Sequence, residues 1–222
     1  MNIFYLDKSA SQAAQYHCDP HVVKMCLETA QILSTVQRMY VDEETCNKNE
    51  LYRSTHRNHP SVQWVQNSIR AYEWTYELFQ ALLAEYKFRY GRTHACASLS
   101  EALSEVPTGI LMAEANRAPV LITNMNEVMR NGAEPEVGQG TKLVPKFRQP
   151  PCAMPKEFFR NHSNKPTDDY EQLSALHSYR TYYAQGKRRL LRYTRRPEPE
   201  WLDAYLGNDV PEAYYGETVS SF

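Results

Sequence analysis

The sequence predicts a mostly α-helical fold: a compact helical single domain with a loop-rich middle and a flexible acidic C-terminal tail. Apolar and aromatic side chains recur at helical spacing over two long stretches, residues 12–39 and 61–90. The middle of the chain, residues 106–155, is interrupted by prolines and glycines, and the C-terminal end carries six acidic residues and no basic one. We therefore expect one helical domain over residues 1–202 and an acidic tail over residues 203–222.

The composition is that of a globular protein without a membrane span. The chain has 222 residues, of which 42% are hydrophobic and 23% charged, and its net charge is −1. The opening MNIFYLDKSA lacks the basic and apolar stretches of a secretory signal. The five cysteines form neither a C-x-x-C pair nor a regular spacing, which favours free thiols over disulfides or a zinc site. We expect a cytoplasmic protein with no cofactor and no bound metal.

The first predicted helix follows a short apolar opening. The segment NIFYL predicts either a short strand or a buried N-terminal arm. Ser9 or Ser11 then offers an N-cap for the helix over residues 12–39. The polar, asparagine-rich residues 40–50 predict a loop after it.

The second predicted helix is bounded by a proline and a glycine. Pro60 suits a first helical turn, the periodic pattern covers residues 61–90, and Gly91 is typical of a helix end. A short helix near residues 98–105 follows. The last strong helix is predicted over residues 168–193, after which the segment RRPEPEW breaks it.

Ionisable and amide side chains follow one another along one face of the first predicted helix. His17, His21, Lys24, Glu28 and Gln31 are spaced as neighbours on a single helix face. A solvated face is the simplest interpretation, but such faces usually carry several Lys and Glu at irregular spacing. Histidine is also a modest helix former, with little reason to occur twice on an exposed face.

Two functional interpretations of this stripe remain. In the first, its histidines and Glu28 bind a metal ion together with His56 and His59 of the segment THRNHP, because imidazoles at i and i+4 can share an ion. Such histidine pairs also arise by chance, so we favour an active-site groove in which Glu28 does acid–base or electrostatic work and the cations bind substrate. The candidate catalytic residues are His17, His21, Lys24 and Glu28, and the candidate substrate-binding residues are Gln31, His56 and His59.

A dense basic segment with interleaved tyrosines lies near the C-terminal end. Seven basic residues and no acidic one occur between Gln172 and Pro197. Guanidinium groups neutralise phosphates, and tyrosine rings give stacking surfaces for unpaired bases. The alternative is a solvated helix with core tyrosines, although so many like charges repel one another unless an anion compensates them. The candidate DNA-binding residues are Arg180, Tyr182, Tyr183, Lys187, Arg188, Arg189 and Arg192.

Several motifs resemble known proteins. The opening MNIFYLD, with QYHCDPHVVKMCLETAQIL and THRNHPSVQWV, resembles a group of small phage proteins that share these motifs. More remotely, the chain resembles the endonuclease V-type pyrimidine-dimer DNA glycosylases of phages and bacteria. Glu28-Thr29 is similar to the glutamate and threonine on that family's first long helix, RNHPSVQWV to its Asn-His-Pro segment, and YRTYYAQGK to the segment it uses on DNA.

The resemblance implies a compact all-helical enzyme in which an N-terminal α-amine attacks the sugar and Glu28 assists. Because Asn2 disfavours removal of Met1, the attacking amine is expected on Met1, with Lys24 as the second candidate. We thus expect a phage-type, DNA-base-directed enzyme, a DNA glycosylase with a possible abasic-site lyase activity, acting in the host cytoplasm if the source is viral. The alternatives are a transferase or metal-dependent enzyme that modifies phage DNA bases or nucleotides, and a non-enzymatic DNA-binding protein.

Overall fold

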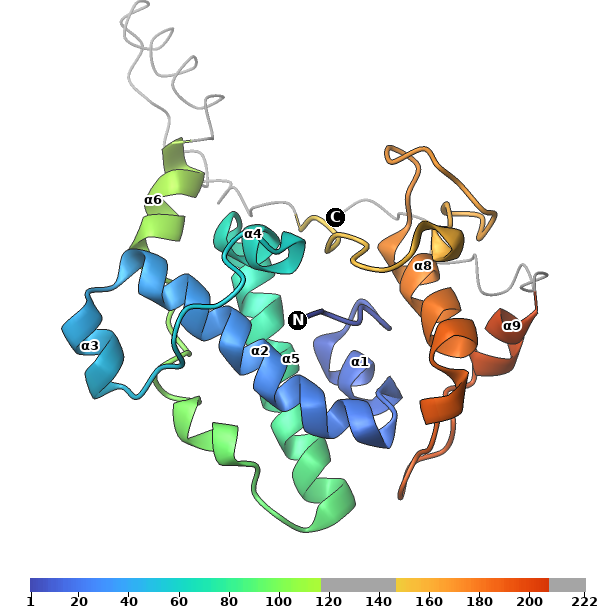
Figure 1. Ribbon diagram of the computed structural model, residues 1–222, viewed down its shortest axis with the longest axis horizontal. Coiled ribbons are helices and arrows are strands. Elements are labelled where there is room, and N and C mark those ends of the chain that lie inside the picture. Colours follow the sequence, from blue (N-terminus) through green and yellow to red (C-terminus); the bar gives the residue numbers. More distant parts are fainter. Residues whose placement is uncertain (117–146, 208–222) are drawn as a thin grey trace, which may run out of the picture.

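Two long helices form the centre of the molecule. The computed structural model describes residues 1–116 and 147–207, which are mostly α-helical, as predicted, and contain no β-strand. Helices α2 (Asp19–Tyr40) and α5 (Ile69–Tyr90) pack against each other, and α1 (Ala10–Tyr16) packs on α5. Figure 1 shows α2 crossing the front of the molecule, with α1 beside it.

The stretch predicted as one helix over residues 12–39 is two helices. The chain leaves the helical conformation at His17 and Cys18, whose ψ angles are 132° and 161°, and Pro20 lies in the first turn of α2. Proline has no backbone N–H to donate, so it fits a first turn but not a helix interior. The prediction of a continuous helix is therefore wrong, and His17 lies outside α2. Ser9 caps α1, accepting from the Gln12 N–H at 3.4 Å.

A short helix replaces the loop expected over residues 40–50. Helix α3 (Glu43–Lys48) begins after Asp42, whose carboxylate accepts a hydrogen bond from the N–H of Thr45 at 2.8 Å. The two glutamates in its first turn also suit the positive end of a helix dipole. These capping signals explain why the polar stretch is helical.

The second predicted helix also divides in two. Helix α4 (Pro60–Gln66) ends at Asn67, and the Ser68 hydroxyl then caps α5 by accepting from the N–H of Ala71 at 3.4 Å. The end of α5 agrees with the prediction, since Gly91 has a φ of 66° and closes the helix in the left-handed conformation that glycine favours.

The segments after α5 are short. A 3₁₀ turn, η1 (Ala95–Leu99), stands where a helix near residues 98–105 is predicted, and α6 (Thr108–Asn116) opens the middle of the chain. Residues 117–146 of the predicted loop-rich middle lie outside the described residues. From residue 147 to 155 the backbone is irregular.

The long C-terminal helix predicted over residues 168–193 is largely wrong. The regular helix begins only after Ser174, whose hydroxyl accepts from the N–H of His177, and it soon changes to a π turn and a 3₁₀ turn. The boundary expected at residue 203 falls inside the last helix, where Tyr205 is fully buried, and the tail from residue 208 lies outside the described residues. The elements are η2 (Lys156–Phe158), α8 (Ala175–Thr181), η3 (Tyr182–Gly186), η4 (Arg188–Leu190) and α9 (Leu202–Leu206).

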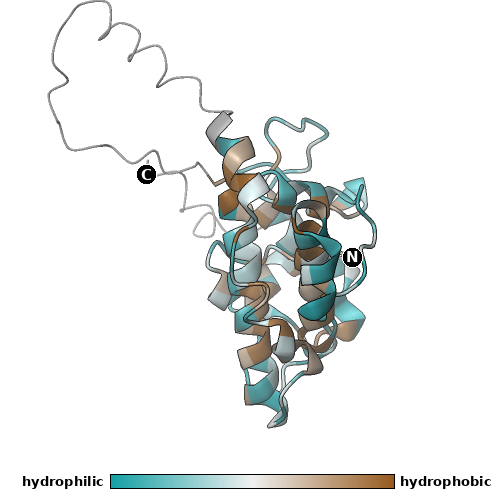
Figure 2. Ribbon diagram, turned by 90° about the vertical axis from the view of Figure 1, so that its left-hand side faces the viewer, coloured by the Kyte–Doolittle hydropathy of each residue, from teal (hydrophilic) through white to brown (hydrophobic). Residues whose placement is uncertain are grey.

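The N-terminal segment is a buried arm rather than a strand. Ile3 and Leu6 are fully buried, and Phe4 and Tyr5 nearly so, in a core that α1, α2, α5 and α8 enclose. Figure 2 shows hydrophobic residues along α6, and Met112 on this helix is 67% exposed. All five cysteines are free. Among the described helices, none is long and apolar enough to cross a membrane.

A buried ion network ties the basic segment to the two long helices. The Arg89 side chain, which is fully buried, donates to Glu85 at 2.7 Å and to Asp19 at 2.9 Å. Asp19 also accepts from the backbone and hydroxyl of Thr194, and Arg196 pairs with Glu85 at 2.8 Å. The chain after η4 is thereby fixed beside the N-terminal end of α2.

Candidate active site

Glu28 lies in the middle of α2 with a side chain that is only 10% exposed. Its two carboxylate oxygens have different partners. Oε1 lies 3.0 Å from Nζ of Lys24, one turn earlier, and Oε2 accepts a hydrogen bond of 2.9 Å from the backbone N–H of Asn2. A shielded carboxylate beside the start of the chain is placed to exchange a proton with a group at that position.

Two distant segments, the loop at Ala153 and helix α8, hold the amino end of the chain against Glu28. The Asn2 side chain donates to the carbonyl of Ala153 at 3.0 Å, and its oxygen accepts from the hydroxyl of Tyr179 at 2.9 Å. Tyr179 is fully buried on α8. Sequence reasoning missed these three residues, because a core tyrosine and an irregular loop carry no sequence pattern that links them to residue 2.

His59 lies near both the amino terminus and Glu28. It caps α4, and its Nδ1 accepts from the N–H of Ser61 at 3.2 Å, which leaves the proton on Nε2. Burial, the positive charge of the chain's amino terminus and that of His56 lower the pKa of His59, while Glu28 opposes them. The neutral ring therefore carries its proton on Nε2, and the charge of Glu28 acts on it.

His56 occupies a strained position in the loop before α4. Its φ is 51°, a left-handed conformation that residues other than glycine rarely adopt, and its side chain is exposed. Nδ1 lies 2.6 Å from the hydroxyl of Thr55. Such strain persists only where the surrounding structure enforces it, and it occurs often at functional sites.

His21 is buried at the N-terminal end of the stripe. Its ring stacks on Phe4 at 4.5 Å between centroids, and its Nδ1 lies 2.9 Å from the hydroxyl of Tyr183. That hydroxyl also accepts a hydrogen bond from the N–H of Cys18. Burial, followed by nearby positive charges, lowers the pKa of His21 to about 3 and keeps the ring neutral.

An aromatic surface adjoins His21. The half-buried ring of Tyr182 lies 4.9 Å from that of Phe158 and 6.2 Å from that of Phe4, and Nζ of Lys187 lies 4.8 Å from its centroid. A Cβ at Gly186 would come within 2.6 Å of the Tyr182 ring, so only glycine allows this packing. The π turn that presents Tyr182 is a distortion common at functional sites.

Three of the predicted site residues lie beneath the surface. His17 is fully buried, with Nδ1 2.6 Å from the carbonyl of Ala13. Tyr183 is also fully buried, and Arg180 donates to the carbonyl of Leu6 and pairs with Asp7. Arg180 connects α8 to the N-terminal arm, and the rings of His17 and Tyr183 pack against Phe4 of that arm, which is the structural alternative for this segment. None of the three offers DNA more than a small surface in this structure.

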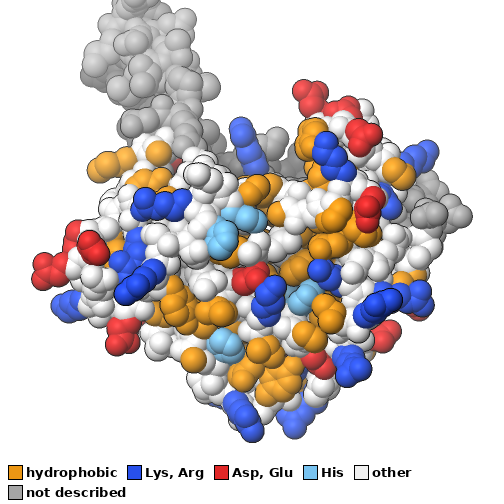
Figure 3. Space-filling view, viewed as in Figure 1, with side chains coloured by type: hydrophobic (Ala, Val, Ile, Leu, Met, Phe, Trp, Pro, Cys, Tyr) orange, Lys and Arg blue, Asp and Glu red, His pale blue; other side chains and the backbone are white. Residues whose placement is uncertain are grey.

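The other predicted residues lie at the surface. Gln31 is half-buried one turn after Glu28, and Lys187 is half-buried beside Tyr182. Arg188, Arg189 and Arg192 are exposed, and the carbonyl of Arg192 accepts from the N–H of Asp19, the first residue of α2. Figure 3 shows histidine, basic and acidic side chains gathered in the middle of this face, with further basic groups towards its edges.

The structure thus brings Lys24, Glu28, His59 and the amino end of the chain together, with His21 and Gln31 along the same helix. Within residues 1–116 and 147–207, no group of three or more His, Cys, Asp or Glu side chains is placed to hold a metal ion.

Comparison with known proteins finds one family for the first part of the chain. The family model described as pyrimidine dimer DNA glycosylase matches residues 1–98, a segment that includes the arm, α2 and His59. No curated protein and no solved structure matches the chain. The first 98 residues therefore resemble the pyrimidine dimer DNA glycosylases, and the match supports a function of the DNA glycosylase type.

Proposed function

We propose that the protein is a pyrimidine dimer DNA glycosylase in which the amino end of the chain attacks the sugar and Glu28 handles the proton. The observation that carries this proposal is the 2.9 Å hydrogen bond from the backbone nitrogen of Asn2 to Oε2 of Glu28. The segment that matches the glycosylase family contains both residues, which supports the substrate class.

The reaction requires an amine with a free lone pair. The nitrogen forms a bond to C1′ of the damaged nucleotide while the bond from C1′ to the base breaks, and the base leaves with that electron pair and takes up a proton. The nitrogen then gives one proton to a neighbouring carboxylate, and its electron pair forms the double bond to C1′ as the bond from C1′ to the ring oxygen breaks. The ring oxygen takes up a proton, and the product is a protonated imine. α-Amines as a class have a pKa of about 7.7 to 8.0, against about 10.4 for lysine side chains, so more of the amine is free near neutral pH.

Two positions of the amine satisfy the geometry. With Met1 present, the amine precedes Asn2 by one residue, and its charge acts on His59. Without Met1, the nitrogen of Asn2 is itself the α-amine and already lies 2.9 Å from Glu28. Lys24 is a weaker candidate, because its ammonium is paired with Glu28 and its side chain is 64% exposed. The sequence favours Met1, and both forms place the nucleophile at the amino end.

The surroundings suit damaged DNA. Neutral His59 carries its proton on Nε2 and can donate to a phosphate or a sugar oxygen, while the neutral ring of His21 is buried. Tyr182 and Phe158 supply aromatic surface beside them, and rings of this kind stack on unpaired bases. An imine at C1′ also permits cleavage of the strand, so we include a lyase activity in the proposal. No observation favours a transferase or a purely DNA-binding protein.

The test measures cleavage of the glycosidic bond in a duplex with one pyrimidine dimer. Glu28→Gln keeps an oxygen that can accept from Asn2 but removes the basic carboxylate, so we expect cleavage to fall by about 10² to 10⁴. DNA affinity and thermal stability should change little. Glu73→Gln, which removes an exposed carboxylate paired with Arg70, is the matched control.

Two results would contradict the proposal: no cleavage by the unaltered protein, or full activity in Glu28→Gln. A large loss of thermal stability in Glu28→Gln would mark the carboxylate as a structural partner of Lys24 instead.

A further inference from the structure

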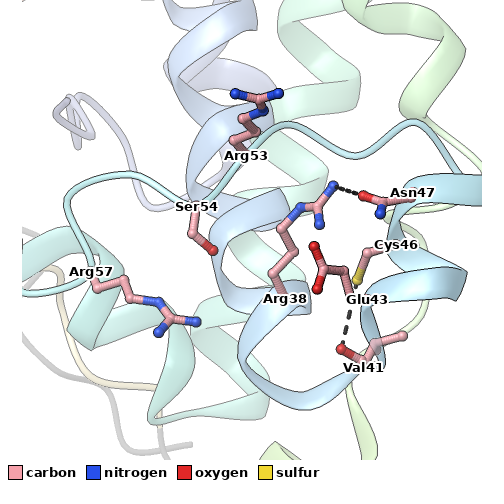
Figure 4. A pocket seen from close by; sticks show the side chains of 8 residues that line it. All are labelled: Arg38, Val41, Glu43, Cys46, Asn47, Arg53, Ser54 and Arg57. Atoms are coloured by element: carbon pink, nitrogen blue, oxygen red, sulfur yellow. Dashed lines mark hydrogen bonds between the residues drawn. The ribbon is translucent and has the colours of Figure 1, made fainter.

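A second cationic site lies at the far end of α2 from the basic C-terminal segment. A pocket of about 510 Å³ lies between the end of α2, α3 and the loop before α4. Arg38, Arg53 and Arg57 line it together with Ser54 and one carboxylate, that of Glu43. Figure 4 shows the side chains of Ser54 and Arg57 directed into the same open space, with Arg38 and Glu43 on its other side.

The three guanidinium groups differ in how they are held. Arg38 is fixed by bonds to the carbonyls of Leu51 and Tyr52 at 2.7 and 2.8 Å and to Asn47 at 2.9 Å. Arg53 and Arg57 are exposed, and among the described residues neither forms an ion pair. Three positive charges and one negative charge therefore line the pocket, with the Arg53 guanidinium directed away from Ser54 and Arg57 (Figure 4), and the fork geometry of arginine suits phosphate oxygens.

The loop that carries Arg53 and Arg57 leads directly to the candidate active site. It runs back along α2, where the Thr35 hydroxyl accepts from the N–H of Thr55 at 3.2 Å. The loop ends at His59, on which the charge of Glu28 acts. The pocket and the catalytic carboxylate thus lie along the same helix and are joined by one anchored loop.

The geometry of α2 sets the distance between the two sites. Arg38 follows Glu28 by ten residues, which at 1.5 Å per residue is about 15 Å along the helix. One DNA strand advances about 3.4 Å per phosphate, so this distance corresponds to about four nucleotides. At the other end Asp19, which contacts the carbonyl of Arg192, precedes Glu28 by nine residues, a similar distance.

We propose that the pocket of Arg38, Arg53 and Arg57 binds a backbone phosphate of DNA about four nucleotides from the damaged base. The duplex then lies along α2, with this pocket at one end and Arg188, Arg189 and Arg192 at the other. The inference rests on the proposed function in taking DNA as the ligand, and it adds the position of a second phosphate-binding site.

The first measurement uses undamaged duplex DNA, so that it does not depend on catalysis. The variant is Arg53→Gln/Arg57→Gln, and the control is Lys48→Gln/Arg70→Gln, which removes two exposed positive charges outside the pocket. Because the pocket is proposed to bind one phosphate, the slope of log affinity against log salt should fall by about 0.9 in the double variant. The control should keep the slope of the unaltered protein.

The second measurement varies the length of duplex on either side of a central pyrimidine dimer. The unaltered protein should gain affinity as one arm passes about four base pairs, and Arg53→Gln/Arg57→Gln should lack that gain. Equal salt slopes and equal length dependence in the two proteins would contradict the proposal that the pocket binds a phosphate. Cleavage of the glycosidic bond by the unaltered protein would then show that the proposed function survives. Absence of both DNA binding and cleavage would contradict the proposed function as well as the phosphate site.

Discussion

At the scale of single residues, the proposed chemistry depends on how firmly the amino end of the chain is held. Tyr179 is the side chain that fixes it from beneath, since its hydroxyl contacts Asn2 and accepts from the N–H of Ala153 at 3.2 Å. It touches no exposed surface, so we regard it as a positioning residue. A nucleophile displaced by about 1 Å can lose about a hundredfold in rate.

Tyr179→Phe should therefore slow catalysis about 10- to 100-fold, with DNA affinity unchanged. Loss of the hydroxyl removes the acceptor of the Ala153 N–H and one of the two hydrogen bonds to Asn2 Oδ1, which should also lower the free energy of unfolding by about 1 to 3 kcal/mol. Tyr72→Phe is the matched control, because Tyr72 is equally buried and its hydroxyl contacts Gln37 and Leu103, away from Glu28. Single-turnover cleavage and denaturant unfolding of both variants separate the two effects. Equal rates in the two variants would show that Tyr179 does not position the amino end.

At the scale of elements, the sequence predicts which segments are helical better than where they end. The apolar period continues through the breaks near Cys18 and Asn67, because the helices on both sides bury their apolar faces in the same core. Pro20 and Ser68 mark these breaks, but both residue types also occur where a helix continues. A related ambiguity affects the predicted C-terminal helix. The sequence does not distinguish a surface position from a buried position for Tyr183 and Arg180.

The candidate site can likewise be predicted from the sequence only in part. Lys24, Glu28 and Gln31 are predictable from spacing, because an α-helix places residues three and four apart on one face. The contact from Asn2 to Glu28 spans 26 residues and that from Tyr179 to Asn2 spans 177, and no local pattern encodes either. His59 is predictable from its motif, whereas its position next to the amino end depends on the packing of α4 on α2.

At the scale of the whole molecule, buried neutral histidines should make the fold sensitive to acid. Burial is the first cause that lowers the pKa of His17 and His177 to about 4 and that of His21 to about 3. The unfolded chain binds protons near pH 6.5, where the folded protein does not. The folded state therefore keeps its full free energy of unfolding above about pH 6.5. It loses part of that free energy as the pH falls towards the pKa values of the buried histidines.

As the pH falls below about 6.5, each of the three histidines should lower the free energy of unfolding by up to about 1.4 kcal/mol per pH unit. Denaturant unfolding at pH 7.5, 6.5 and 5.5 should show the decline. The exposed His56 provides a control, because His56→Gly removes a surface imidazole and relieves the left-handed backbone without changing the buried groups. Its slope with pH should match that of the unaltered protein, and a free energy of unfolding that stays constant from pH 7.5 to 5.5 would contradict the neutral buried rings.

On the scale of the whole molecule, the amino end contacts Glu28 in the middle of α2, and a cationic group lies near each end of that helix. The central claim is that the amino end, placed by Asn2 and Glu28, is the nucleophile. Borohydride reduction of the protein with DNA containing an abasic site tests it most directly, since an imine would be trapped as a stable covalent complex. Peptide mapping should then place the DNA on the first residue of the chain, whether Met1 or Asn2. Attachment to Lys24, or cleavage of dimer-containing DNA without any trapped complex, would contradict the claim.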